Sequence, residues 1–357
     1  MRQLYSQYLE ACACGKDQQW IPGRSGGNRS KEIPSEVVDL WKRMFKANPP
    51  ASYSFAASEG LRRFGFRADR ATVRRWARLH ELAASKPRKQ ESAFIRRWQC
   101  QQIGALWQLD VSPHAWFGPG SVNLPLFDLI DDCSRMMVGT GLYSRESLLA
   151  YLDFLPRAFE EYGLPLALYV DYHSFFFSYL PDALTCLGEA LRFYDISFKY
   201  ASTPQAKGKV ERAHQFWQKR LPSYFSAESI ADISQANIHI QQLRVHHNEF
   251  EIHRELQMTP QKAWNQAQGE KRSVLRPKPP SPWWPYIWSL RTTVKVDIDG
   301  TVPVGNQRIK TNFLLGKKLT RCEHSDGSFT FLANPPGSGG KPIVVLRYEY
   351  HPSKSKS

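Results

Sequence analysis

The sequence predicts an α/β protein built from three parts, and three patterns along the chain support this prediction. Apolar residues recur at helical spacing from Ile33 to Phe64, strand-like and helix-like segments alternate over residues 103–270, and period-two alternation begins near Val294. Alternation of strands and helices is typical of a sheet covered by helices. We therefore expect a central α/β core, preceded by a helical module and followed by a small all-β domain.

The helical module is expected at residues 33–82, after a mobile N-terminal segment and Gly/Arg/Ser-rich linker at residues 1–32. An apolar helix is followed by a second helix from Tyr53 to Phe64, and Gly65 supplies a turn. Asp69 can cap a third helix at residues 71–80 by accepting hydrogen bonds from its first free N–H groups.

The third helix has one apolar face and one basic face. Its apolar residues, expected to face inward, are Val73, Trp76 and Leu79. Its outward residues are Arg74, Arg75 and Arg78, and the basic connector at residues 83–102 adds Arg88 and Lys89. This pattern indicates a helix-turn-helix that reads DNA, although a three-helix bundle with solvated arginines and a solvated linker has the same pattern.

The core at residues 103–270 is expected to contain a mixed five-stranded sheet with helices. Strands are expected at residues 105–110, 124–130, 135–143, 165–170 and 196–202. Helices are expected at residues 145–162, with Ser144 as the cap, and at residues 180–193, 207–221, 233–247 and 260–268. Asp131 and Asp132 stand in a tight turn between the second and third strands, which explains them without a metal.

A proline-rich basic linker is expected at residues 271–287, because clustered prolines favour an extended conformation. Beyond it, Val294, Val296 and Ile298 alternate with polar residues up to Asp299-Gly300, a strong hairpin signal. Residues 288–350 are therefore expected to form a compact β-barrel.

The charge of the chain favours a nucleic-acid partner. It contains 48 Lys and Arg against 33 Asp and Glu among 357 residues, a formal net charge of +15, and the basic residues are clustered. A basic protein with scattered charge is the alternative. The six cysteines form neither a zinc pair nor a disulfide framework, which favours a reducing cytoplasm. No apolar run approaches a membrane-spanning length.

Three acidic residues indicate the chemistry: Asp110 and Asp171 end predicted strands, and Glu211 begins a basic helix. Carboxylates so placed could hold two magnesium ions about 4 Å apart, the arrangement that serves displacement at phosphorus. Taken singly, each acid has a simpler role as a turn former, a cap or a solvated helix residue.

Neighbouring residues add candidates for binding. His173 could orient water or a phosphate, or it is an imidazole satisfied by hydrogen bonds at the edge of the site. Lys207, Lys209 and Arg212 could hold DNA phosphates near Glu211, or they form a solvated basic face.

The sequence resembles the DDE transposases of bacterial insertion sequences, which have a retroviral-integrase-type core, and most closely the ISNCY-type group. The segments that carry the resemblance are Gln108–Trp116, Leu129–Arg135, Asp171–His173, Thr203–Arg212, His246–Phe250, His253 and Thr259–Trp264. Relatives usually carry a further helix-turn-helix ahead of the one predicted here, so residues 1–30 are expected to be the tail of such a module.

The resemblance implies a ribonuclease H-like core with a helix-turn-helix before it and a β-barrel after it. It implies an enzyme that cuts at the ends of its own element and joins the 3′ hydroxyls to target DNA, using Asp110, Asp171 and Glu211 as catalytic and metal-binding residues. Mg²⁺ would be the cofactor, with Mn²⁺ as a substitute. The partners would be double-stranded DNA and further copies of the chain, in the bacterial cytoplasm at the nucleoid.

Two other functions fit parts of the same pattern. A DNA-binding protein derived from a transposase would use the helix-turn-helix and basic surfaces without cutting, and the complete set of acids argues against it. A structure-specific nuclease on the same fold would not need flanking DNA-binding modules.

Overall fold

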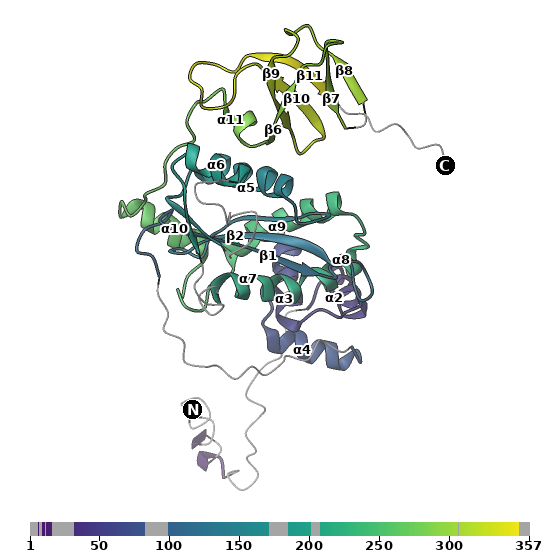
Figure 1. Cartoon of the computed structure of the whole chain (residues 1–357). Helices are drawn as coiled ribbons and strands as arrows, with labels where there is room; N and C mark the ends of the chain where they lie inside the picture. Colours follow the sequence, from purple (N-terminus) through teal and green to yellow (C-terminus); the bar gives the residue numbers. More distant parts are fainter. Residues whose placement is uncertain are drawn as a thin grey trace, which may run out of the picture.

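The computed structural model describes residues 32–82, 99–170, 185–200, 208–305 and 307–349, together with residues 6, 9, 10 and 12–15; for residues 208–211 it describes the backbone alone. Figure 1 shows three regions along the chain: helices near the N-terminus, a central sheet with helices, and a C-terminal group of strands. This order agrees with the predicted order of elements.

The N-terminal region contains α2 (Ser35–Lys46), α3 (Tyr53–Phe64) and α4 (Arg70–Leu79). The bounds predicted for α3 are confirmed, because Ser52 caps its start and Gly65 ends it in the left-handed conformation at φ 64°. The predicted cap of α4 is also confirmed, since Thr72 N donates to Asp69 Oδ1 at 2.6 Å. The inward position predicted for Leu79 was wrong: its side chain is 76% exposed.

The central sheet has five strands in the order β3-β2-β1-β4-β5. Their bounds are β1 (Trp107–His114), β2 (Leu124–Asp131), β3 (Met137–Leu142), β4 (Ala167–Val170) and β5 (Ser197–Tyr200). The first three strands pair antiparallel and β4 and β5 run parallel to β1, so the predicted mixed five-stranded sheet is confirmed. The predicted end of β1 was wrong, because the strand continues past Asp110 to His114.

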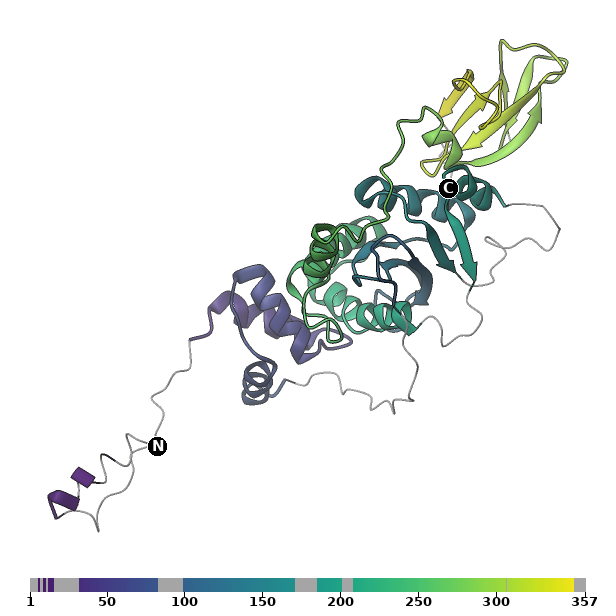
Figure 2. The ribbon, with the colours of Figure 1, turned by 90° about the vertical axis from the view of Figure 1, so that its left-hand side faces the viewer.

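Helices cover both faces of this sheet (Figures 1 and 2). On one face lie α5 (Leu148–Tyr162) and α6 (Cys186–Phe193). On the other face lie α7 (Gly208–Gln218) and α8 (Leu221–Glu228). Helix α9 (Ile233–Phe250) runs beside the edge strand β3, where its Asn237 and Asn248 bond to the backbone of Leu142 and Met137. The cap predicted for α5 was wrong: Ser147 rather than Ser144 accepts a hydrogen bond, from Ala150 N, because the helix begins one turn later than expected.

The N-terminal helices share a hydrophobic core with the sheet. One cluster joins Val37, Leu40, Trp41 and Phe55 of α2 and α3 to Leu126, Met137 and Leu142 of the sheet and to Trp217, Leu221, Phe225 and Ile240 of α7 to α9. The boundary predicted at residue 82 therefore separates two stretches of sequence that contribute to one core.

Partly buried polar contacts reinforce this junction. Glu251, at the end of α9, accepts hydrogen bonds from Ser58 of α3 at 3.1 Å and from Arg220 at 2.8 Å, and its Oε2 lies 3.2 Å from His247 Nδ1. Burial alone would raise the pKa of Glu251, but the hydrogen bond from His247 and the charge of Arg220 outweigh burial and lower the pKa below its ordinary value of 4.5. The carboxylate is thus held in its charged form at the junction.

After α10 (Pro260–Gly269), the chain runs along the core before it reaches the C-terminal region. Ile103 N donates to Arg272 O at 3.0 Å, and Leu164 N donates to Arg276 O at 2.7 Å. The first part of the predicted linker at residues 271–287 is thus fastened to the core. Its last residues form a short helix, α11 (Trp284–Ile287).

The C-terminal region consists of a four-stranded sheet in the order β11-β10-β9-β6 and a two-stranded ribbon, β7-β8. The bounds are β6 (Leu290–Lys295), β7 (Thr301–Val304), β8 (Gln307–Lys310), β9 (Lys318–Glu323), β10 (Ser328–Leu332) and β11 (Val344–Glu349). A turn does form at Asp299-Gly300, but the strands on either side pair elsewhere, β6 with β9 and β7 with β8. Ile298, the last apolar residue of the predicted alternation, lies in this turn and is 95% exposed. Closure into a barrel stays a prediction.

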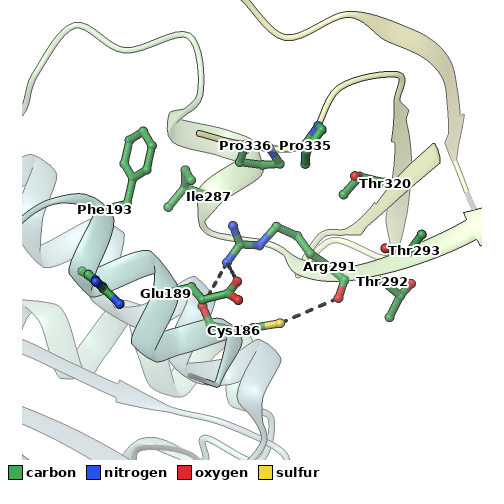
Figure 3. Close-up of a pocket in the computed structure, with 11 residues that line it drawn as sticks. Cys186, Glu189, Phe193, Ile287, Arg291, Thr292, Thr293, Thr320, Pro335 and Pro336 are labelled. Atoms are coloured by element: carbon green, nitrogen blue, oxygen red, sulfur yellow. Dashed lines mark hydrogen bonds and ion pairs between the residues drawn. The ribbon is translucent and has the colours of Figure 1, made fainter. Parts of the chain in front are cut away.

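Arg291 of β6 connects the C-terminal region to α6 (Figure 3). Its guanidinium donates to Glu189 at 3.0 Å and to the carbonyl oxygen of Cys186 at 3.1 Å. Trp284, Tyr286 and Trp288 also join the hydrophobic cluster that contains residues of α5 and α6. A cavity of about 580 Å³ lies at this junction, and Arg291 is part of its lining.

Among the described residues, none of the six cysteines forms a disulfide bond, as the spacing predicts. No helix in the described part of the chain combines the length and apolar character needed to cross a bilayer.

Candidate active site

Strand β1 separates apolar from polar side chains by its period of two. Trp107 and Leu109 join the cluster that packs against α5 and α6. The alternate residues of the strand, including Asp110 and Ser112, have side chains on the opposite face. They lie toward α7, where Gln218 Nε2 donates to Ser112 Oγ at 3.0 Å. The Asp110 side chain is 18% exposed, so this carboxylate lies at the edge of the packed region with access to solvent.

A second carboxylate lies directly opposite Asp110 on the neighbouring strand. Asp128 of β2 pairs with Asp110 in the β1–β2 register and is fully buried. Its Oδ1 accepts hydrogen bonds from Thr140 Oγ1 at 2.8 Å and from Trp217 Nε1 at 2.9 Å. Burial raises the pKa of Asp128 well above its ordinary range despite these two hydrogen bonds, and the charge of Asp110 adds to the rise.

His214 of α7 lies between the two carboxyl groups. Its Nδ1 is 3.5 Å from Asp110 Oδ2, and its Nε2 is 3.6 Å from Asp128 Oδ2. The His214 side chain is buried, 9% exposed, and Trp217 follows it by three residues on the same helix face. Helix α7 therefore brings two side chains onto the pair of carboxyl groups.

Sequence reasoning missed Asp128 and His214. A carboxyl group inside the apolar run Leu126–Ile130 was an available signal for Asp128, because such a position rarely holds a charge without a partner. His214 offered a weaker signal, its spacing of three residues after Glu211.

The other two predicted acids belong to the elements that flank this site. Asp171 directly follows β4, the parallel neighbour of β1, and lies outside the described residues. Glu211 lies in α7, one turn before His214, but its side chain is outside the described part of the structure. Their convergence on Asp110 stays a prediction, as does the role of His173, which also lies outside the described residues.

The basic candidates fall into three groups. Arg74, Arg75 and Arg78 are exposed on α4. Arg212 is half exposed and forms an ion pair with Glu255. Arg88, Lys89 and Lys207 lie outside the described residues, and the side chain of Lys209 is not described.

Asp131 and Asp132 act as turn residues, as predicted. Asp131 Oδ2 accepts hydrogen bonds from Ser134 N at 2.8 Å and Ser134 Oγ at 2.7 Å, and Asp132 accepts from Cys100 N and Gln108 Nε2, each at 2.7 Å. Both carboxyl groups are fully buried, whereas the Asp110 side chain is 18% exposed.

Asp110 fits one part of a magnesium site. Mg²⁺ takes oxygen ligands and keeps several waters, so a carboxylate with access to solvent suits it, whereas the buried and hydrogen-bonded Asp128 does not. No group of three or more potential ligands lies among the side chains that the structure describes. The remaining ligands would have to come from positions such as Asp171 and Glu211.

The fold and this site define the protein as an α/β protein with carboxylates on the sheet face beside α7.

No protein-family model matches the chain. Over 141 residues it is 37% identical to the transposase for insertion sequence IS1202 of Streptococcus pneumoniae, which covers 38% of this chain and 30% of that protein. Over 211 residues it is 30% identical to y4bF of Sinorhizobium fredii, which carries the provisional name of a transposase; this covers 55% of the chain and 46% of y4bF.

The chain thus spans less than half the length of the curated relatives that it matches. Among solved structures, the magnesium complex of the HTLV-2 integrase catalytic core domain has a TM-score of 0.37 at 17% identity, covering 45% of this chain and 97% of that one. A chain of the simian T-cell lymphotropic virus intasome has a TM-score of 0.42 at 15% identity, covering 78% and 88%. These structural likenesses are too weak to bear on function, whereas the sequence similarity supports the predicted likeness to transposases.

Proposed function

We propose that the chain is a DDE transposase of the ISNCY-type group with a ribonuclease H-like core. It would cleave DNA at the ends of its element and join the freed 3′ hydroxyls to target DNA. The observation that carries the proposal is the solvent-accessible carboxylate of Asp110 on the central strand β1. Strand β4, which pairs with β1, ends next to Asp171, and α7 contains Glu211. Similarity to two transposases over part of the chain supports it.

The three acids would hold two Mg²⁺ ions, for which Mn²⁺ could substitute. When bound, such ions activate the attacking oxygen and stabilise charge on the leaving 3′ oxygen. Asp110 would contact both ions, Asp171 would complete one site and Glu211 the other. The sheet would hold the backbone of Asp110 in place, because β1 pairs with β2 along its whole length and with β4 at Trp107 and Gln108. No covalent bond between enzyme and DNA is required.

Double-stranded DNA would be the partner, both as element ends and as target, and the active form would contain several copies of the chain on the nucleoid. The net charge of +15 favours phosphate binding through release of counterions. The exposed arginines of α4 would enter or approach a groove, with the helix-turn-helix as their support.

The test is a cleavage and strand-transfer assay on end-labelled duplexes that carry the DNA flanking the gene. Asp110→Asn, Asp171→Asn and Glu211→Gln each remove a charge with little change in shape, so each is expected to abolish both steps in Mg²⁺ while DNA affinity is retained. Glu270→Gln, which changes an exposed glutamate outside the proposed site, is expected to cleave like the unaltered chain.

Wild-type cleavage by the Asp110→Asn variant would refute the assignment of that residue. A wild-type chain that binds these duplexes but cleaves none of them would instead favour the DNA-binding protein without cleavage activity.

A further inference from the structure

We propose that His214 is a positioning residue that holds the Asp110 carboxylate in its metal-binding orientation and is itself braced by Asp128. This inference rests on the proposed function, because it concerns the same site. The geometry points to it: one rigid ring contacts both carboxyl groups, with Asp110 Oδ2 at 3.5 Å from one nitrogen and Asp128 Oδ2 at 3.6 Å from the other.

The far end of this arrangement is fixed by the core. Thr140 of β3 and Trp217 of α7 both donate to Asp128 Oδ1, so the carboxyl group cannot rotate without breaking a buried hydrogen bond. Asp128 Oδ2 accepts no hydrogen bond within the described part of the chain and faces the imidazole. Asp128 is therefore a fixed support for the ring.

The orientation of the ring gives the contact with Asp110 its direction. The two ring nitrogens of a histidine are distinct, and each faces a different carboxyl group here. Nε2 faces the fixed Asp128, so Nδ1 is the nitrogen that faces the Asp110 carboxylate.

A contact of this kind bears on metal affinity. Partners that orient a ligating carboxylate typically contribute about 10–100-fold in metal affinity or activity, although they never touch the ion. Asp110 is 18% exposed and lies on a strand whose other neighbour, β4, pairs with it only at Trp107 and Gln108. The His214 ring supplies a lateral constraint on its side chain that the strand alone does not.

Two substitutions of His214 test the contacts of its two ring nitrogens separately. His214→Asn places an amide near the position of Nδ1 and retains the contact with Asp110. His214→Gln places the amide near Nε2 and retains the contact with Asp128 instead. His246→Gln is the matched control, because this buried histidine lies on α9 and its Nε2 contacts Ser58 Oγ at 3.2 Å.

The measurement is Mn²⁺ binding to the full chain, followed by the electron paramagnetic resonance signal of the free ion, together with the Mg²⁺ dependence of cleavage. We expect His214→Gln to raise the apparent Mn²⁺ dissociation constant about 10-fold or more and His214→Asn to raise it less. The Mg²⁺ concentration for half-maximal cleavage should rise in parallel, while the rate at saturating Mg²⁺ is largely recovered. His246→Gln should bind Mn²⁺ like the unaltered chain.

The two proposals fail in different ways. If Asp110→Asn leaves Mn²⁺ binding unchanged, the metal site itself is wrong and the proposed function fails. If Asp110→Asn abolishes binding while both His214 variants bind Mn²⁺ normally, or if Asn is the more harmful replacement, the positioning role is refuted and the proposed function stands. Thermal unfolding of each variant distinguishes loss of metal affinity from loss of the fold.

Discussion

The buried ion pairs of Glu59 give a measurable prediction about how the N-terminal helices are held to the core. Glu59 of α3 is fully buried, and it accepts hydrogen bonds from Arg62 at 2.7 Å and from Arg63 at 2.9 Å. The same two arginines reach α8, where Arg62 donates to the Tyr224 hydroxyl and Arg63 pairs with Glu228 at 3.0 Å. Removing Glu59 therefore disturbs both α3 and its contact with α8.

The size of the effect follows from what the arginines lose. Removing one partner of a buried ion pair costs about 3–5 kcal/mol, because the other charge is left without compensation. Arg62 and Arg63 keep side-chain exposures of 17% and 19%, and Arg63 keeps Glu228, so the lower end applies. We expect Glu59→Ala to reduce the free energy of unfolding by about 3 kcal/mol and to lower Tm by roughly 5 °C.

The assay is thermal and urea unfolding followed by tryptophan fluorescence. Trp41 of α2 and Trp217 of α7 belong to the same hydrophobic cluster, so chains retaining either one as a reporter should show coincident transitions. Glu270→Ala is the control, because it removes an exposed ion pair with Arg272 and should leave Tm unchanged. An unchanged Tm in Glu59→Ala, or separate transitions for the two tryptophans, would refute the reasoning.

Two further predictions concern pH and DNA. The pKa of Glu251 is lowered in the folded chain, so the stability that the carboxylate contributes is complete above the unfolded pKa of 4.5 and is lost as pH falls toward the folded pKa. The difference in unfolding free energy between the unaltered chain and Glu251→Gln should therefore shrink below pH 4.5. A constant difference from about pH 3 to 7 would contradict this prediction. Replacing Arg74 and Arg75 together by Ala should weaken DNA binding and reduce the slope of log affinity against log salt by about 1 per lost phosphate contact. Arg157→Ala, which removes another exposed arginine, should keep the original slope in titrations at several salt concentrations, and an unchanged slope in the double variant would exclude α4 as a phosphate-binding helix.

Local signals in the sequence were sufficient where the structure is determined locally. The bounds of α3 could be predicted because periodic apolar residues end at a glycine that takes a left-handed conformation, which other residues adopt at a cost. The cap at Asp69 is likewise a contact between residues three positions apart. The order of strands and helices in the core followed from periodicity in the same way.

The extent of β1 could not be read locally. Its sequence turns polar after Asp110 and contains Pro113, which suggests a strand end. The strand nevertheless continues, because β2 pairs with β1 up to His114. Strand β4 pairs with β1 only at its start, so Pro113 lies where β1 has no hydrogen-bonded neighbour on the β4 side. Pairing between distant segments decided the outcome.

The candidate site shows the same division. Asp110 could be proposed from its place in a motif, but its two neighbours could not, because the contact with Asp128 depends on the β1–β2 register and the contact with His214 depends on how α7 packs across the sheet. Neither relation has a local pattern. The role of Asp171 and Glu211 as metal ligands is proposed from the sequence alone. The structure gives only the positions of the elements to which they are attached, β4 and α7.

The polarity of the sheet face beside α7 is itself an argument for a functional site. Leu126 and Ile130 occupy the positions on β2 that flank Asp128 on this face, and both are buried apolar residues, so an apolar residue at position 128 would complete a conventional core. A buried carboxyl group costs free energy even when hydrogen-bonded, and Thr140 and Trp217 satisfy only Oδ1. The fold alone gives no reason for this cost in free energy. A role in holding His214 against Asp110 gives one, because a polar group at this depth contacts the ring nitrogen that faces away from Asp110. Departures from apolar core packing of this kind are expected at functional sites.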